Sequence, residues 1–175
     1  MALSASHWSR EASVATRRAF YTAVAGLLVS IYGLYVEIRF EMDHDYSAMC
    51  DVSALISCTR VLTSEYGSGF GIIGPLFGES SPLNQKNAFY GVIGYSVLAA
   101  IQLSNAQWSA NISLVAGILM NIMSVYLFVI LLVLRTICLV CYSIYVVNAS
   151  FLYFTLKRRR ALAECTNINN TSGNS

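Results

Sequence analysis

Long apolar runs that carry almost no charge dominate this sequence. Four of them approach the roughly 20 residues that a helix needs to cross the hydrocarbon core of a bilayer. The chain of 175 residues is 56% hydrophobic and only 11% charged, whereas an average soluble domain has about 25% charged residues. The runs are continuous and do not alternate with polar residues, so they predict helices and not the strands of a β-barrel. The predicted transmembrane helices cover residues 19–36, 87–104, 112–134 and 137–156.

These runs predict the fold class: an all-α membrane protein built as a four-transmembrane-helix bundle. The length leaves room for one domain, residues 1–175. A predicted cap loop, residues 37–86, joins the first two helices, and the polar residues 161–175 predict a disordered tail. The formal net charge of +2 is too small to indicate binding to nucleic acid.

The placement of lysine and arginine predicts the orientation of the helices. Both ends of the chain are basic, with Arg10, Arg17 and Arg18 before the first run and a basic stretch at 157–160 after the last. The loop 37–86 is acidic by comparison. We therefore expect both termini in the cytosol and the loop on the lumenal or extracellular side. That side is oxidising, which suits disulfide chemistry at the cysteines of the loop.

The loop itself has two parts. Apolar and cysteine side chains between Val52 and Tyr66 recur at spacings of three and four, which predicts an amphipathic helix. The glycine-rich stretch 67–78 follows, but no strand precedes it and no Lys-Ser/Thr ends it, so it does not indicate a phosphate site. Its apolar residues, among them Phe70 and Phe77, predict a segment that dips into the membrane interface.

Cys138 and Cys141 carry the strongest chemical signal. The two intervening residues place both thiols on one helical turn, and the start of the fourth predicted helix supplies free N–H groups that favour a thiolate. Cys50 and Cys58 form a second pair in the loop, suited to thiol–disulfide exchange with the first. Cys165 stands apart in the tail. Arg135 is interpreted as a flanking residue that snorkels to the interface.

Two alternatives for the four clustered cysteines stay open at this point. They can form structural disulfides that brace the loop, or together they can supply four sulfur ligands to zinc. The spacing of Cys50 and Cys58 differs from usual zinc knuckles, and an oxidising compartment favours disulfides over metal thiolates. We therefore favour a redox pair and predict no metal site.

The cysteine segments also resemble a known family. Residues 48–61 (AMCDVSALISCTRV), 67–71 (GSGFG), 83–91 (LNQKNAFYG) and 137–145 (ICLVCYSIY) are similar to the vitamin K epoxide reductase family of animals. The resemblance implies a four-helix bundle in the endoplasmic reticulum membrane that holds a lipid quinone beneath the lumenal loop. It implies reduction of vitamin K epoxide to the quinone and of the quinone to the hydroquinone. Electrons would come from a lumenal thioredoxin-like or protein disulfide isomerase-type partner, with no tightly bound cofactor.

The resemblance also assigns roles to residues. Cys138 and Cys141 match the active pair, with Cys141 nearest the quinone, while Cys58 matches the shuttle that attacks Cys138 and Cys50 meets the outside reductant. Asn87 and Tyr145 match hydrogen-bond donors to the two quinone carbonyls, a role that low dielectric strengthens. Leu62 and Tyr90 stand where the family usually has an aromatic pair lining the substrate pocket, and Tyr66 where it has tryptophan. These departures leave sensitivity to anticoagulants open.

Two other functions stay possible. The same thiols can run in the opposite direction, in a quinone-linked oxidase that generates disulfides for protein folding, because direction follows potentials and substrate supply. A non-catalytic four-helix protein with a disulfide-braced loop is the other alternative. It would have no need for a Cys-x-x-Cys pair at membrane depth.

Overall fold

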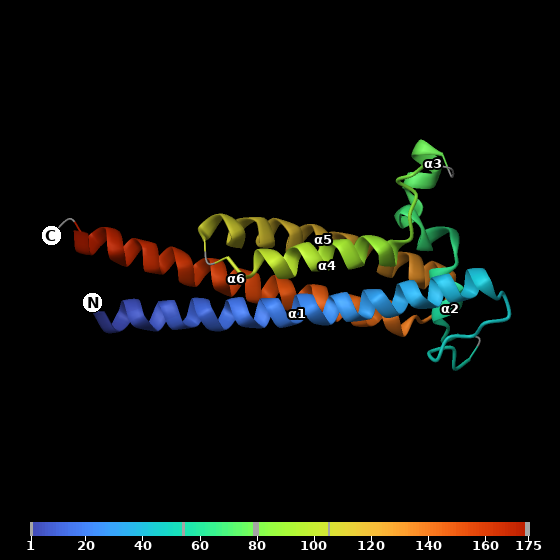
Figure 1. Cartoon of the computed structure of the whole chain (residues 1–175), viewed down its shortest axis with the longest axis horizontal. Helices are drawn as coiled ribbons and strands as arrows, with labels where there is room; N and C mark the ends of the chain where they lie inside the picture. The colour runs from blue at the N-terminus through green and yellow to red at the C-terminus, as the bar shows by residue number, and fades with distance from the viewer. Residues whose placement is uncertain (1, 54, 79–80, 105, 174–175) are drawn as a thin grey trace.

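The computed structural model describes residues 2–53, 55–78, 81–104 and 106–173 and is almost entirely helical (Figure 1). The long helices are α1 (Ala2–Met42), α5 (Gln107–Leu134) and α6 (Leu139–Gly173), with the shorter α4 (Asn87–Ile101) packed among them. Two five-residue helices, α2 (Cys58–Leu62) and α3 (Ile73–Phe77), lie in the segment between α1 and α4. Successive long elements reverse direction, so the two termini lie at the same end of the bundle (Figure 1). We call residues 43–86, at the other end, the cap segment.

Three helices among the described residues are long and apolar enough to cross a membrane: Ser6–Met42 within α1, α5, and Leu139–Ile168 within α6. Helix α4 is apolar but shorter. The described residues contain isolated β-bridges and no sheet. The prediction of an all-helical, multi-pass membrane protein is confirmed.

Small residues allow the helices of the bundle to approach closely. Helix α1 packs against both α4 and α6, and α5 packs against α6. A side chain at Gly91 of α4 would overlap Ser30 of α1, and Gly33 of α1 faces Ala88 and Val140. Such small contacts are the usual way in which membrane helices gain packing energy, because lipid already solvates their apolar side chains. They bring α1 against the N-terminal ends of both α4 and α6.

The bounds of the long helices differ from those predicted. Helix α1 begins at Ala2 and continues beyond residue 36 to Met42, and α6 continues to Gly173. The sequence predicts disorder from residue 161, yet residues 161–173 are helical, and Ala161 is buried. Alanine, leucine and glutamate at 161–164 have high helix propensity, so the helix continues past the last apolar residue. Residues 174–175 of the predicted tail lie outside the described range, as do residues 54 and 79–80 of the predicted loop.

The amphipathic helix predicted between Val52 and Tyr66 is wrong in extent. Among the described residues of this stretch, Cys58–Leu62 is α-helical, with Ser57 as its N-cap accepting a hydrogen bond from the Arg60 amide, and Glu65–Gly67 forms a 3-10 turn. The preceding residues pair as bridges instead, Ser53 with Ile56 and Ile56 with Ile137. Of the periodic apolar side chains, Leu62 is buried, whereas Val52 and Leu55 are exposed, and a helical period over so short a stretch is a weak signal.

Helix α3 projects sideways from the bundle at the level of the cap segment (Figure 1). Its side chains Leu76 and Phe77 are 70% and 64% exposed. Exposed apolar side chains at the edge of a membrane bundle suit the interface between water and lipid. Anchoring of this segment in the membrane interface stays a prediction.

Candidate functional site

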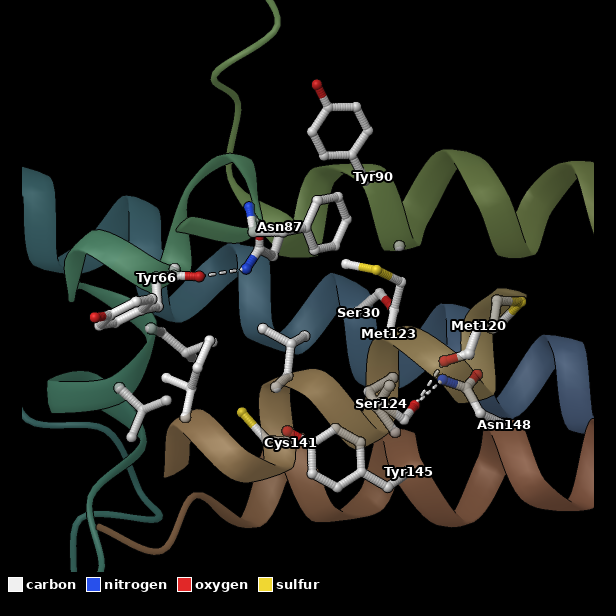
Figure 2. Close-up of a pocket in the computed structure, with 18 of the residues that line it drawn as sticks. Ser30, Tyr66, Asn87, Tyr90, Met120, Met123, Ser124, Cys141, Tyr145 and Asn148 are labelled. Atoms are coloured by element: carbon white, nitrogen blue, oxygen red, sulfur yellow. Dashed lines mark hydrogen bonds between the residues drawn. The ribbon is translucent and has the colours of Figure 1, made fainter. Parts of the chain in front are cut away.

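A cavity of about 310 Å³ lies inside the bundle beneath the cap segment. Helices α1, α2, α4, α5 and α6 all contribute to its wall, most of which is apolar. Figure 2 shows Cys141 and Tyr145 of α6 across the cavity from Asn87 of α4. A mostly apolar cavity with a few polar side chains directed into it is typical of a binding site for a small hydrophobic molecule.

The two cysteines of the Cys-x-x-Cys sequence face different surroundings. Cys138 is fully buried just before α6 begins, whereas Cys141 is partly exposed and lines the cavity. Both are free thiols, and the backbone N–H of Cys141 donates to Cys138 Sγ at 3.3 Å. The N–H groups of a helix N-terminus stabilise negative charge on such a sulfur. The geometry thus presents one thiol to a ligand and holds the other behind it as a stabilised nucleophile.

Cys50 and Cys58 form a disulfide in the cap segment. Cys58 is completely buried at the start of α2, and the hydroxyl of Tyr32 lies 4.0 Å from Cys50 Sγ. The carboxyl of Asp51 lies close to both sulfurs, a grouping that could hold a metal ion. Both sulfurs are used by the disulfide, however, and Asp51 is already engaged by hydrogen-bond donors.

Asp51 organises the loop around this disulfide. Its carboxylate accepts hydrogen bonds from the backbone N–H groups of Ala48 at 2.9 Å and Thr59 at 3.1 Å, and from the Thr59 hydroxyl. Burial raises the pKa of Asp51, but hydrogen bonds from Thr59, Ser57 and Ala48 outweigh it and lower that pKa to about 2. The ionised carboxylate therefore fixes the backbone on both sides of the cysteine pair.

The backbone brings the two cysteine pairs together. The amide of Ile137 donates to the carbonyl of Leu55 at 2.7 Å, and the amide of Ser57 donates to the carbonyl of Ile137 at 3.0 Å. Cys58 and Cys138 directly follow these paired residues, and both belong to one buried cluster against which Cys141 packs. A disulfide of the cap segment and the thiol pair of α6 thus meet at one end of the bundle.

Asn87, the first residue of α4, ties the cap segment to the cavity. Its side-chain oxygen accepts a hydrogen bond from the Phe70 amide at 2.7 Å, and its NH₂ group donates to the Tyr66 carbonyl at 2.6 Å (Figure 2). Phe70 has a left-handed backbone, with φ of 57°, between two glycines of the same hand. An amide NH₂ carries two hydrogens, so one N–H of Asn87 is still free to donate to a ligand.

Tyr145 lies one helical turn beyond Cys141. Its hydroxyl is buried and has no hydrogen-bond partner among the described residues, although its ring packs against Phe128 and Tyr142. Buried hydroxyl groups normally find a partner. An unpartnered donor in the wall of a cavity is therefore a strong indication that a ligand supplies an acceptor there.

Leu62 and Tyr90, the other two residues predicted to bind substrate, also line the cavity. Leu62 is buried at the end of α2. The ring of Tyr90 stacks on Phe70 with centroids 5.5 Å apart, and its hydroxyl, which donates to the Leu83 carbonyl, points away from the cavity (Figure 2). These two residues offer apolar surface only.

Comparison with known proteins identifies the family. A family model described as "Vitamin K epoxide reductase family" matches residues 18–156. The chain is also 32% identical over 136 residues to the vitamin K epoxide reductase complex subunit 1 of Rattus norvegicus and to that of Mus musculus. Each alignment covers 77% of this chain and 84% of the relative.

The chain belongs to the vitamin K epoxide reductase family. The resemblance noted from the cysteine segments is thereby confirmed. Membership makes the protein a membrane oxidoreductase whose chemistry joins redox cysteines to a quinone, and the two cysteine pairs needed for it are in place.

The floor of the cavity is polar, and its residues were not predicted from the sequence. Tyr95 donates to Asn148 Oδ1. Asn148 Nδ2 donates to Ser124 Oγ at 2.8 Å (Figure 2). Asn121 adds a hydrogen bond to the Asn148 carbonyl at 3.0 Å. Asparagine inside a predicted transmembrane run is itself a signal, because polar side chains at that depth are costly and are retained for packing or function.

Proposed function

We propose that this protein uses thiols to reduce vitamin K epoxide to the quinone, and the quinone to the hydroquinone. The observation that carries the proposal is the pairing, in one apolar cavity, of a partly exposed Cys141 with the unpartnered hydroxyl of Tyr145. A naphthoquinone is flat and apolar, with two carbonyl acceptors on opposite edges. Tyr145 and the free N–H of Asn87 lie on facing walls and suit those two acceptors.

The chemistry follows from the positions of the two thiols. The Cys141 thiolate attacks the quinone, and negative charge develops on a carbonyl oxygen that a buried donor such as Tyr145 stabilises. The Cys138 thiolate then attacks Cys141 Sγ, so the bond from sulfur to substrate breaks and a Cys138–Cys141 disulfide forms. Two electrons pass from the thiols to the ring, and two protons complete the hydroquinone. Reduction of the epoxide likewise consumes two electrons and two protons and releases the oxygen as water.

The cap segment is proposed to return the electrons. A lumenal dithiol protein reduces the Cys50–Cys58 disulfide, and the Cys58 thiolate attacks Cys138 and releases Cys141. The backbone pairing of Ile56 with Ile137 supports this step, because it holds Cys58 and Cys138 at the same end of the bundle. Exchange needs only a local movement of the cap segment.

The membrane arrangement belongs to the same proposal. We take α4 as a fourth span: its 15 residues make about 22 Å of helix, and the chain needs it to return from the cap end before α5 runs back (Figure 1). Both termini are then cytosolic, and the cap segment faces the lumen of the endoplasmic reticulum. The basic residues at both ends of the chain support that orientation.

Loop variants test the relay. Cys50→Ala and Cys58→Ala should keep activity with dithiothreitol, which reaches the active pair directly, and lose it with a lumenal protein reductant. A merely structural disulfide predicts another pattern, because its loss costs roughly 2–5 kcal/mol of stability and lowers both activities and the protein level together. Cys165→Ala is the control and should behave as wild type.

The intermediate can also be trapped. In Cys141→Ala, Cys138 has no partner and should form a lasting disulfide with Cys58, which makes the chain run faster on a non-reducing gel. If no such crosslink forms, and the loop variants lose both activities equally, the relay is wrong.

A further inference from the structure

Glu37 of α1 is a buried acid that the proposed chemistry does not use. Its side chain is fully buried, and neither carboxyl oxygen has a hydrogen-bond partner among the described residues. A charged group without partners is among the most costly things to bury, and it is buried at lower cost as the neutral acid. Ionisable residues held at such positions in membrane proteins usually serve function.

The register of α1 places Glu37 beside the redox site. Gly33, one turn earlier on the same face, contacts Ala88 of α4 and Val140 of α6. Helix α6 runs antiparallel to α1 (Figure 1), so the next turn of α1 reaches the level at which α6 begins, immediately after Cys138. Val36, the neighbour of Glu37, lies in the same buried cluster as Cys58 and Cys138.

Four other charged or titratable groups among the described residues act on Glu37. They are Lys86 before α4, Glu41 on α1, Cys138, and Cys141 on α6. Lys86 is paired with Glu41, with Nζ and Oε1 2.8 Å apart. The N-terminal ends of α4 and α6 are also at this level, and their dipoles favour a carboxylate when one forms. These surroundings accommodate both the neutral acid and the carboxylate of Glu37.

We propose that Glu37 holds the proton that the Cys138–Cys141 pair exchanges during its redox cycle. The proposal rests on the proposed function. When Cys58 attacks Cys138, the Cys138–Cys141 bond breaks and Cys141 leaves as a thiolate, which takes the proton of Glu37. When Cys141 next attacks a quinone, the Glu37 carboxylate takes that proton back.

The protons balance over the cycle. Hydroquinone receives one proton from Cys138 and one from lumenal water, while Glu37 keeps the proton of Cys141. During re-reduction, Glu37 returns its proton to Cys141, the Cys50 proton restores Cys138, and the Cys58 proton passes to lumenal water. Electrons move only among the sulfurs and the quinone.

The test compares Glu37→Gln with Glu41→Gln in the full-length, detergent-solubilised protein. Pre-reduced protein is mixed with vitamin K quinone, and hydroquinone is measured in a single turnover from pH 6 to 9. Glu37→Gln should be no less stable to heat than wild type, because the substitution removes a buried carboxyl without a partner. The rate of hydroquinone formation by this variant at neutral pH should nevertheless fall about a hundredfold. The difference from wild type should shrink near pH 9, where a thiol can lose its proton directly to water. Glu41→Gln should keep the wild-type rate and pH profile.

A second measurement needs no turnover. The rate at which iodoacetamide alkylates Cys141 at neutral pH should also be lower in Glu37→Gln than in wild type, and it should rise only at higher pH, because no carboxylate then takes the proton of Cys141. If the variant shares both profiles with Glu41→Gln, Glu37 holds no exchangeable proton. If wild type itself turns nothing over, the proposed function fails, and alkylation still decides the role of Glu37. Should Glu37→Gln not accumulate, Glu37→Leu, which also removes the carboxyl, is compared in the same way, and a wild-type rate and alkylation profile there overturns the proposal.

Discussion

The polar side chains of the cavity differ in how many of their hydrogen-bonding groups already have a partner within the protein. The amide of Asn87 holds Tyr66 and Phe70 of the cap segment and keeps one N–H for a ligand. The hydroxyl of Tyr145 has no partner among the described residues. Under the proposed function, we expect Asn87 to couple substrate binding to closure of the cap, and Tyr145 to bond the substrate alone. Substitution should separate these two roles.

Removing the hydroxyl of Tyr145 should therefore lower turnover and leave the thermal stability of the protein unchanged. Tyr145→Phe deletes a donor that makes no hydrogen bond in the free protein, so the thermal midpoint should change little. Turnover of vitamin K epoxide with dithiothreitol should fall about a hundredfold. Tyr142→Phe is the matched control, since Tyr142 belongs to the same aromatic cluster and does not line the cavity. Equal losses in the two variants would contradict a donor role for Tyr145.

At the scale of elements, the cap segment is a short chain held by side-chain bonds more than by secondary structure. Asp51 fixes Ala48 and Thr59, the Cys50–Cys58 disulfide closes the loop, and Asn87 holds the glycine-rich turn. The sequence could predict which residues shape the cap segment, because a cysteine pair and a glycine-rich stretch are recognisable in a sequence. It could not predict the conformation, since the apolar period between Val52 and Tyr66 fits a helix, and the pairing with Ile137 depends on residues distant in the chain.

Acid should loosen the cap segment through Asp51. The folded-state pKa of Asp51, about 2, lies below its ordinary value near 3.9. The stability that this carboxylate contributes is therefore complete above about pH 4 and is lost as the pH falls toward 2. Pepsin cleavage of the cap segment in purified protein should rise over that window. Asp51→Asn should already be cleaved quickly at pH 4, whereas Asp45→Asn should follow wild type. A wild-type profile in Asp51→Asn would show that the carboxylate does not hold the loop.

At the scale of the whole molecule, the bundle could be predicted from its apolar runs more completely than its polar contacts could. The runs predicted the three long helices and the shorter α4, because a bilayer demands length and low charge. They did not show that Arg158 turns inward to donate to Gln102 at 2.6 Å and to Ser109 at 2.7 Å. Nor did they show that Glu37 is buried. In the sequence, Glu37 and Arg158 are charged residues at the ends of apolar runs. Only the packing of the helices decides whether such a side chain turns inward or outward.

The orientation in the membrane has a direct test. Protease added to sealed microsomes should remove a tag fused after Ser175 and should spare the cap segment, because basic termini favour the cytosol. Detergent should then expose the cap segment to cleavage. Protection of the tag in sealed vesicles would invert the topology and place all four redox cysteines in a reducing compartment.

The central claim is that the Cys138–Cys141 pair gives its electrons to the quinone substrate. Purified, fully reduced protein is mixed with vitamin K epoxide without any other reductant, and both the quinone formed and the state of each cysteine are measured by mass spectrometry. With vitamin K epoxide in excess, wild type should form quinone while both cysteine pairs become disulfides, and the Cys50→Ala/Cys58→Ala double variant should form quinone while Cys138 and Cys141 become a disulfide. Cys141→Ala should form none. Quinone from Cys141→Ala, or quinone from the double variant with Cys138 and Cys141 still free, would contradict the account.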